Sequence, residues 1–570
     1  MKLHVIPSGK DDSILYFAKS VRIGSKTTTK NVKKLGKLSE LKKIYEDPIS
    51  HFKEEARRLT EEGKVESSFQ IPQNCMLDPL KTRKIKFGYI FPQSIYYSLG
   101  LDNTMRKIKS DSKIDYDFNR IIRDLVIGRI LDPMSKNSTY TLAKSFPETP
   151  DYDLHHIYRA LSKVCENFDF IEAEAFKGMK EYADVDTSVT YYDCTNFYFE
   201  AEEEDGFRTY GKSKENRPNP IVQMGLFLDR NGLPISMCIN PGKTNEQVTM
   251  IPLEKKMKER FGIEKFVVCA DCGLSSAKNL KYNSDSDHGF IVTKSLKKTK
   301  EEIREKLMKE DGWKLYNSDK TYTLKEIREN ENLRDLIFYH DEWFIDDKGF
   351  KERIITTYCE KLRLYQKHIR EKQIQRAIKL IQENKLKKKV NQNDARRFII
   401  ETKVTSNGEV ADNSILTLDS NKIEDEAKYD GFYAVTTDLN DDANEIVRIN
   451  KGRWEIEESF RIMKTEFDAR PVYLSREDRI RSHFLICYLS LMIYRIIEQK
   501  LQKEKEYYTS KEIIQTLRNY DMIDMGNFYV GAIEGVAVHA LEKTFKIVGS
   551  LQAMSKASFR SIIKKSKIEE

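Results

Sequence analysis

The chain has 570 residues, of which 39% are hydrophobic and 33% charged, and it carries a formal net charge of +8. This length exceeds what one hydrophobic core serves, so three or four structural units are expected, and the composition excludes an intrinsically disordered protein. The N-terminus has no signal-peptide pattern, and the longest apolar run, residues 484–494, is too short to span a bilayer. We therefore expect a cytoplasmic protein without membrane contact.

The cysteines and histidines indicate no disulfide framework and no metal cluster. The eight cysteines follow no framework spacing, which is typical of a reducing compartment. Cys269 and Cys272 form a C-x-x-C pair, but no second pair follows at zinc-ribbon spacing, so we interpret both as apolar residues on a buried strand and its end. His155-His156 and the other histidines show no ligand spacing and are interpreted as structural or solvent-facing.

Up to residue 186 the chain predicts a small β element followed by helices. The first part, residues 1–80, contains a β-hairpin around Gly24-Ser25 and then a charged amphipathic helix at 38–62. The second part, residues 81–186, is mostly helical and basic. A helix-turn-helix could lie within 116–146, and a plain helical packing domain fits this segment equally well.

The β-rich pattern that begins at residue 187 predicts a mixed α/β sheet, because three hairpin strands are followed by a helix and a short buried strand. We place this region at 187–294 and its continuation at 431–500. The expected strands cover 189–200, 221–228, 234–240, 265–270, 289–293 and 432–437.

Residues 295–430 interrupt this sheet pattern with alternating Lys-rich helical and β-like stretches. Within them, residues 361–397 hold 13 Lys and Arg against three Asp and Glu, a local excess of +10 that is larger than the charge of the whole chain. This excess favours a polyanionic partner, although a solvated basic helix has the same composition. The last part, residues 501–570, is expected to be helical.

Two aspartates occupy positions where an unpaired carboxylate is costly. Asp193 lies within an aromatic strand, and Asp271 follows the apolar strand 266–270. A divalent cation with hard oxygen ligands is one partner, and a hydrogen-bonded turn or cap is the simpler alternative for each. With Glu457 as a third carboxylate, two strands and a helix could hold two metal ions about 3.5–4 Å apart, an arrangement that activates a nucleophile against a phosphodiester.

Glu457 belongs to the segment 453–464, which contains no Gly or Pro and predicts a helix. Arg453, Glu457 and Lys464 form a narrow charged stripe beside its apolar face, with Arg461 at the edge. Taken alone, the segment fits a surface helix with an Arg453–Glu457 i,i+4 pair. Beside metal-binding carboxylates, the cations of the stripe would instead bind backbone phosphate.

These residues together resemble the DDE transposases of insertion sequences, in the subgroup marked by Tyr-x2-Arg-x3-Glu-x6-Lys. Arg453, Glu457 and Lys464 match that spacing, whereas Asn450 stands at the tyrosine position. Asp193-Cys194-Thr195 resembles the Asp-x-Thr motif of the family, and residues 270–276 resemble its Ala-Asp-x-Gly segment. The resemblance implies an RNase H-like catalytic core interrupted by a β-rich insertion domain at 295–430.

By this resemblance the protein binds the terminal inverted repeats of its element, hydrolyses the phosphodiester at each end and joins the freed 3′-OH to target DNA. Asp193, Asp271 and Glu457 would be the catalytic and metal-binding residues for two Mg²⁺ ions, for which Mn²⁺ can substitute. Arg453, Lys464 and Arg461 would contact DNA. The partners are double-stranded transposon ends and target DNA, with a homodimer in the synaptic complex and a nucleoid association in a prokaryote.

Some relatives pass through a hairpin on the excised end, where an insertion-domain tryptophan stacks on a flipped base. Trp313 and Trp343 are the two tryptophans of 295–430, so they are candidates for this DNA contact, while a half-buried sheet position is the simpler role for each. Two other functions fit the same motifs: an RNase H-like metal-dependent nuclease without strand transfer, and a non-catalytic DNA-binding protein. Three intact carboxylates argue against the second.

Overall fold

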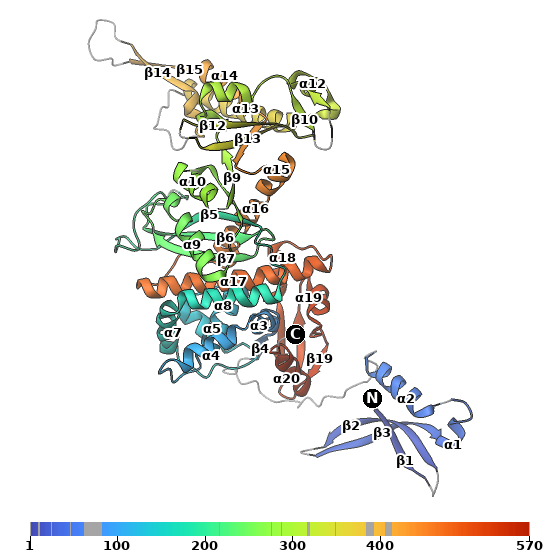
Figure 1. The fold of residues 1–570 in the computed structure, drawn as a ribbon. Helices are drawn as coiled ribbons and strands as arrows, with labels where there is room; N and C mark the ends of the chain where they lie inside the picture. The colour runs from blue at the N-terminus through green and yellow to red at the C-terminus, as the bar shows by residue number, and fades with distance from the viewer. Residues whose placement is uncertain are drawn as a thin grey trace. The chain divides into compact units, whose positions relative to one another are not determined.

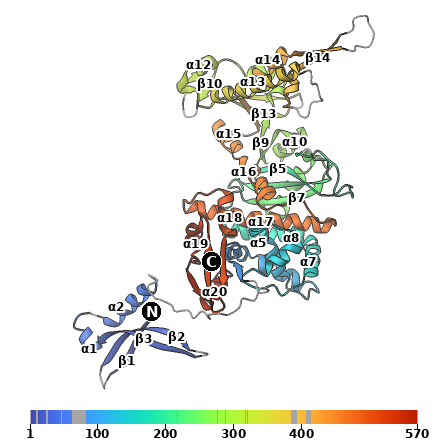
Figure 2. The ribbon, with the colours of Figure 1, turned by 180° about the vertical axis from the view of Figure 1, so that it is seen from behind.

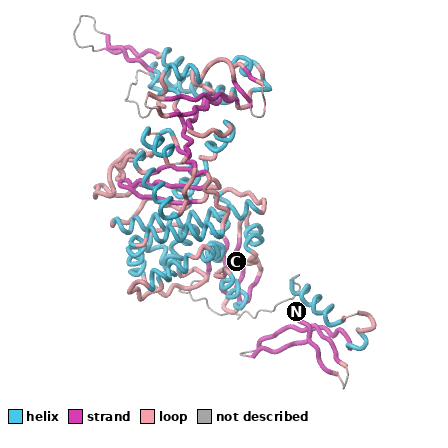
Figure 3. Tube along the Cα trace, viewed as in Figure 1, coloured by secondary structure: helices cyan, strands magenta, loops and turns pink. Residues whose placement is uncertain are grey.

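The computed structural model describes residues 2–8, 12–23, 26–45, 47–61, 83–215, 217–274, 276–286, 288–315, 318, 320–347, 349–383, 393–404 and 413–568. The chain forms two compact units. One comprises Met1–Pro79 with Met525–Phe528, and the other comprises Leu80–Asp524 with Tyr529–Glu570. Strands and helices occur in both units (Figure 3).

The first unit is a three-stranded antiparallel sheet with two helices. Its strands are β1 (Lys2–Pro7), β2 (Ser13–Ile23) and β3 (Lys26–Lys37), in that order across the sheet. The predicted hairpin is confirmed as β2 and β3, and its turn lies outside the described residues. The single predicted helix is instead α1 (Leu38–Leu41) and α2 (Pro48–Glu61). Pro48 explains the break, because proline disfavours a helical residue before it and suits the first helical position.

A ten-stranded mixed sheet runs through the second unit, which confirms the expected α/β class. Its strand order is β11-β10-β12-β13-β16-β9-β8-β5-β6-β7. The strands, in chain order, are β5 (Val189–Tyr198), β6 (Ile221–Asp229), β7 (Pro234–Pro241), β8 (Val267–Ala270), β9 (Gly289–Lys294), β10 (Trp313–Leu315), β11 (Thr321–Tyr322), β12 (Phe338–Ile345), β13 (Lys351–Tyr358) and β16 (Phe432–Thr437).

The two halves of this sheet differ in how their strands pair. β5, β8 and β9 are parallel neighbours, and β6 and β7 continue the sheet antiparallel beside β5. This arrangement is consistent with an RNase H-like core. On the other side, β16 pairs antiparallel with β9 and with β13, so the strands of residues 313–358 extend the same sheet. The helices flanking the β5–β9 half are α9 (Met250–Phe261), α10 (Ala277–Asp285), α15 (Ala443–Lys451) and α16 (Trp454–Arg461).

Residues 295–430 also contain helices and a separate two-stranded ribbon. Their basic run lies on the 23-residue helix α13 and continues to residue 397, with 384–392 outside the described residues. The elements here, besides the sheet strands, are α11 (Glu301–Leu307), α12 (Leu324–Glu329), α13 (Glu360–Gln382), β14 (Ile399–Val404), β15 (Asn413–Leu418) and α14 (Ser420–Ala427).

The helical part of the second unit packs around α17 (Glu477–Lys503), which lies between β7 and the earlier helices in both views (Figures 1 and 2). Among the described helices α17 is the one long and apolar enough to cross a membrane, but 94% of its most apolar stretch is buried in the protein. Packing therefore accounts for its apolarity. The earlier helices are α3 (Ile90–Ser98), α4 (Leu101–Ser110), α5 (Phe118–Leu131), α6 (Lys136–Ala143), α7 (Leu154–Glu166) and α8 (Phe168–Tyr182).

The C-terminal region 501–570, which was expected to be helical, contains strands as well as helices. Three short strands from this region form a four-stranded sheet with β4 (Lys84–Lys86), in the order β19-β18-β17-β4. Such strands carry little periodicity of their own, and β17 is defined by pairing with a segment more than 400 residues earlier. The C-terminal elements are α18 (Ser510–Arg518), β17 (Tyr520–Asp524), β18 (Phe528–Ile533), α19 (Val538–Phe545), β19 (Ala553–Ser555) and α20 (Lys556–Lys565).

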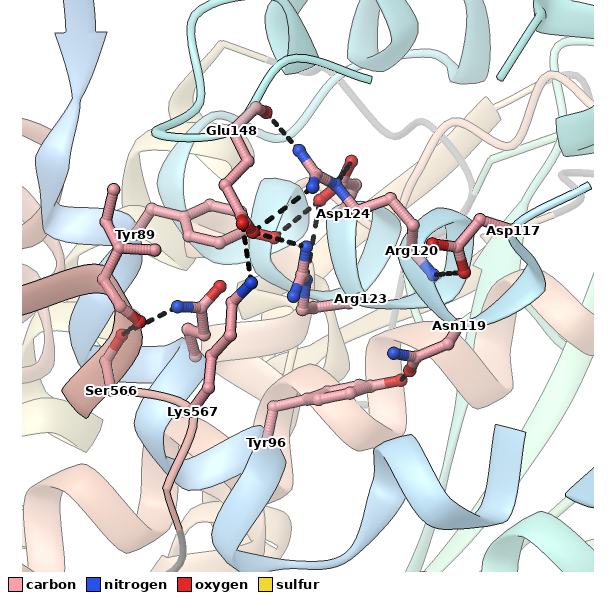
Figure 4. A network of polar contacts seen from close by, with 12 residues as sticks. Tyr89, Tyr96, Asp117, Asn119, Arg120, Arg123, Asp124, Glu148, Ser566 and Lys567 are labelled. Atoms are coloured by element: carbon pink, nitrogen blue, oxygen red, sulfur yellow. Dashed lines mark hydrogen bonds and ion pairs between the residues drawn. The ribbon is translucent and has the colours of Figure 1, made fainter. Parts of the chain in front are cut away.

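A buried charge network ties the end of the chain to α5 (Figure 4). Arg120 and Arg123 of α5 pair with Asp124 and Glu148, and Lys567, just after α20, reaches Glu148 at 2.6 Å. Every charged group in this network has an opposite charge within reach, which is the condition for burying ions without a large penalty.

Candidate active site

Two aspartates lie where the pairing between the parallel strands β5 and β8 ends. The last registered pair between β5 and β8 places Tyr192 opposite Ala270. The next residues are Asp193 on β5 and Asp271 just beyond β8. Neighbouring parallel strands in register project corresponding side chains from the same face. The fold therefore brings both predicted aspartates to adjacent positions, Asp193 in the middle of β5 and Asp271 just after β8.

The Asp193 carboxylate is largely buried, with 20% of its side chain exposed. Its Oδ1 accepts a hydrogen bond from the backbone N–H of Cys194 at 2.7 Å and lies 3.8 Å from the Lys214 Nζ. Burial raises the pKa of Asp193, and the Lys214 ammonium offsets this only in part. The carboxylate thus has less positive charge around it than its ionised form needs, a setting that favours a bound cation.

Helix α16 carries Glu457 to the same part of the fold. Its apolar face, with Ile456 and Phe460, is buried, and the helix packs against β5 and β6. Gly452 precedes it closely, and a Cβ there would collide with the Tyr191 hydroxyl of β5. Glu457 itself is exposed and has no hydrogen-bond or ion-pair partner within the described part of the chain. Its carboxylate is free to take a ligand.

Arg453, at the start of α16, links this helix to Asp271 and to Thr293 on β9. Its Nη1 lies 3.4 Å from the Asp271 Oδ1 and donates a hydrogen bond to the Thr293 Oγ1 at 2.9 Å. Its positive charge also lowers the pKa of Asp193. The Arg453–Glu457 pair of an ordinary surface helix does not form here, since Arg453 points toward the second aspartate instead.

A tyrosine from β16 lies beside Asn450, the residue that departs from the family motif. Asn450 is buried, and its Nδ2 donates to the hydroxyl of Tyr433, on β16, at 2.8 Å. The same hydroxyl lies 2.9 Å from the Thr293 Oγ1, which accepts from Arg453. Asn450, Tyr433, Thr293 and Arg453 thus form one hydrogen-bonded chain that ends at Asp271.

Lys464 belongs to a second group of charges on the Asp193 side. It lies on the π-helical turn Ile462–Glu466 that continues α16, and such turns are frequent at functional sites. Its Nζ is 3.6 Å from the Glu215 Oε1, which also pairs with Arg470. Burial lowers the pKa of Lys464 to about 8, while Asp193 acts in the opposite direction. Lys464 is therefore a poorly hydrated cation whose pKa the charge of Asp193 raises.

The donor set of Asp193, Asp271 and Glu457 suits a divalent cation. All three offer carboxylate oxygens, the ligands that Mg²⁺ prefers, and two of them are exposed enough to receive one. Their oxygens do not all lie within 4.8 Å of one another, so they form no closed cage for a single ion among the described residues. Open carboxylates at separate points fit ions that also bind the substrate and water.

The expectation that no histidine has ligand spacing needs correction. Asp153, His155 and His156 bring their ligand atoms within 4.8 Å of one another, on the surface at the start of α7. The local fold explains this cluster, because the His156 Nδ1 accepts from the Asp153 N–H in a capping box, and the Tyr116 ring stacks on His156.

Comparison with known protein families agrees with this geometry. The sequence model of the family described as "Transposase DDE domain" matches residues 185–493, more than half of the chain. The chain belongs to this family. The resemblance to insertion-sequence DDE transposases is thereby confirmed, and the family indicates a nuclease-type enzyme that acts on DNA and uses divalent metal ions. A search of curated proteins found no match.

Three predicted DNA-contacting residues of this transposase make contacts with residues other than Asp193 and Asp271. Arg461 pairs with Glu458 at 2.6 Å and with Ser510, at the start of α18. Trp313 is fully buried in the hydrophobic cluster of residues 295–434. Trp343, on β12, is 36% exposed, with the Lys351 ammonium 4.4 Å from its ring centre. Of the two tryptophans, Trp343 is the one with an accessible ring.

Several residues near the transposase site were not predicted. Lys214 and Glu215 come from a loop and Glu246 from the short 3-10 helix Glu246–Val248, and Lys214 also contacts the Cys194 carbonyl and lies 3.6 Å from Glu246. In the sequence, the polar run 211–218 contains Lys214 and Glu215 and the run 242–246 ends at Glu246, and both runs are part of the resemblance to the family. Thr293 and Tyr433 gave no signal, because they lie on ordinary strands whose pairing alone brings them to Arg453.

Proposed function

We propose that this protein is the DNA transposase of an insertion sequence, with an RNase H-like catalytic core. It binds the terminal inverted repeats, hydrolyses the phosphodiester at each end and joins the 3′-OH to target DNA. The observation that carries the proposal is the adjacent placement of Asp193 and Asp271 where the parallel pairing of β5 and β8 ends, with Arg453 linking α16 to Asp271. The family match supplies the class of substrate.

Asp193, Asp271 and Glu457 are the proposed catalytic residues and would hold two Mg²⁺ ions, replaceable by Mn²⁺. When bound, such ions activate the attacking oxygen and stabilise the leaving one. Arg453 and Lys464 orient the scissile strand by binding its phosphates, since both cations are partly desolvated and attract anions more strongly than exposed ones do. Lys214 holds the Asp193 carboxylate in place.

The other regions follow as proposals from this activity. Residues 1–80 and 81–186 are the accessory and end-binding regions, residues 187–294 and 431–500 form the core, and 295–430 is the insertion domain. Two ends must be paired, so we place a homodimer in the synaptic complex, in the cytoplasm and on the nucleoid. The C-terminal region 501–570 packs on the helical part.

A pocket of about 550 Å³ beside the site supports an approach of DNA along the insertion region. It lies between α13 and the strands β9 and β16, and Tyr433 belongs both to its wall and to the Arg453 hydrogen-bonded chain. Its lining includes two carboxylates, Glu426 and Asp430, which pair with Arg397 and Arg370. The basic and aromatic side chains of the lining suit the backbone and bases of a nucleic acid: Lys294, Lys297, Arg370, Arg397, Tyr365, Tyr429 and Tyr433.

Joining of precut ends tests this function. The full chain is incubated with Mg²⁺, duplexes that carry the element's terminal repeats with a free 3′-OH, and a target plasmid. Covalent joining to the plasmid is the expected result, and flanking-sequence duplexes of equal length are the control. Plasmid nicking without joined products would identify a metal-dependent nuclease, and binding without either product would identify a non-catalytic DNA-binding protein.

Replacing Lys464 by alanine is expected to weaken binding to transposon ends and to reduce its salt dependence by about one counterion, because one phosphate contact is lost. Binding is measured by fluorescence anisotropy across a series of KCl concentrations. Lys258→Ala, an exposed lysine on α9, is the matched control and should keep the wild-type slope. An unchanged slope for Lys464→Ala would remove this residue from the phosphate contacts.

A further inference from the structure

Two buried cations have no counter-charge among the residues that the structure describes. Six lysine and arginine residues are buried in the described part of the chain. Lys136 and Arg129 alone among these six form no ion pair with a described residue, and both line the same pocket. The other four form ion pairs of 2.6–3.1 Å with Asp or Glu: Arg120, Arg123, Arg353 and Arg495.

The pocket has a volume of about 100 Å³ and a positive lining. The Lys136 Nζ lies 3.4 Å from the Nδ1 of His483, and the buried Nε of Arg129 has no hydrogen-bond partner among the described atoms. Ser135 and Lys136 are the N-cap and first residue of α6, so the positive end of that helix dipole also lies here. Asp468, the one lining carboxylate, is exposed and forms no ion pair with either cation.

Burial without a counter-ion is unfavourable for the charged forms of two basic side chains of the pocket, Lys136 and His483. It lowers the pKa of Lys136 to about 7 and that of His483 well below its usual value, and in each case Arg129 adds to the effect. The network in Figure 4 is the contrast, because there each buried arginine has its carboxylate. An anion in the pocket would remove this imbalance.

We propose that this pocket binds one phosphate group, held between the Lys136 ammonium and the Arg129 guanidinium at the N-terminus of α6. The volume fits, since it equals that of roughly three water molecules in the liquid, enough for one small tetrahedral anion. Tyr473, which is 73% exposed, forms part of the lining, so the pocket lies next to the surface.

The phosphate group has two sources that share this chemistry, a DNA backbone and a free phosphate. The DNA source rests on the proposed function. The wall formed by Asp468 and residues 471–474 follows the turn that carries Lys464, and Arg129 donates to the Phe467 carbonyl between them. A phosphate bound here would therefore fix the segment that leaves the candidate active site.

Thermal unfolding of the full chain in low-millimolar inorganic phosphate tests the site without DNA. Phosphate, compared with chloride at equal ionic strength, is expected to raise the Tm of the wild type by a few degrees at saturation. The rise should vanish in Lys136→Met. It should persist in Lys144→Met, which removes an exposed lysine from the other end of α6. Lys136→Gln, which keeps a polar side chain, replaces Lys136→Met should that variant not fold.

An equal rise in all variants, or no rise in the wild type, would overturn the proposal. Because this arm needs neither DNA nor cleavage, its failure is distinguishable from failure of the proposed function. The salt dependence of binding to transposon ends then separates the two sources. A slope reduced by about one counterion in Lys136→Met assigns a DNA phosphate, and an unchanged slope with the Tm rise retained in the wild type assigns a free phosphate.

Discussion

Replacing Asp193 by asparagine is expected to lower the rate of transposon-end cleavage at least about 1000-fold, while binding to the ends is kept or strengthened. The reason is that metal ions contribute several kcal/mol to such reactions, and each 1.36 kcal/mol changes a rate tenfold. Asparagine has the same shape but binds a divalent cation poorly, and it removes a negative charge that would repel DNA. Cleavage is measured with labelled end duplexes and Mg²⁺, and binding is measured in the absence of metal.

The matched control for Asp193→Asn is Glu246→Gln. Glu246 lies 3.6 Å from the same Lys214 ammonium that faces Asp193, so its replacement removes a neighbouring negative charge without touching a proposed metal ligand. We expect its cleavage rate to stay within about tenfold of the wild type. Equal losses in both variants would mean that general electrostatics, and not metal binding at Asp193, governs the reaction.

Replacing Arg495 by methionine is expected to lower the free energy of unfolding by about 3–5 kcal/mol, because it leaves buried carboxylates without their cation. Arg495 is 5% exposed on α17, and its guanidinium donates to the Ser459 Oγ and the Glu455 carbonyl of α16 and to Glu498 at 2.6 Å. Burial already raises the pKa of Glu455 to about 7 while Arg495 lowers it, so losing the arginine worsens its position.

The loss is measured from urea unfolding of the full chain. Arg476→Met is the control, since this arginine at the N-cap of the same helix forms an exposed pair with Asp478 and should change stability by about 1 kcal/mol or less. Arg495→Met should also reduce cleavage, because the arginine fixes the helix that carries Glu457. A stability loss no larger than that of Arg476→Met would contradict the assigned role of Arg495.

Local sequence patterns predicted the helices and strands of this protein more completely than they predicted which strands pair. The strands β5 to β8 have apolar or aromatic runs bounded by turn residues, and α16 has a clear helical period, so each was visible in the sequence. The extension of the sheet through β16 was not, since it depends on contacts between segments more than 100 residues apart. The pairing of β17 with β4 was missed for the same reason, since it joins segments more than 400 residues apart.

In the candidate site, too, residues marked by local sequence motifs were predicted, and residues placed by strand pairing were not. The residue types and spacing of Asp193, Asp271 and Glu457 marked them as a possible set, and the parallel register of β5 and β8 explains how the first two become neighbours. No spacing rule could assign Tyr433 to the position beside Asn450, because its hydroxyl arrives there through strand pairing. The residue that departs from the motif, Asn450, is thus hydrogen-bonded to a tyrosine from another part of the chain.

The hydrogen-bonded chain from Asn450 to Asp271 has a consequence for how the protein is made. Asp193, Asp271 and Thr293 leave the ribosome first, but Tyr433, Asn450 and Arg453 follow only after all of residues 295–430 have been synthesised. A nascent chain that ends before β16 therefore contains Asp193 and Asp271 but lacks Glu457, Arg453 and Lys464. Translation order alone keeps the site incomplete until the segment 295–430 is present.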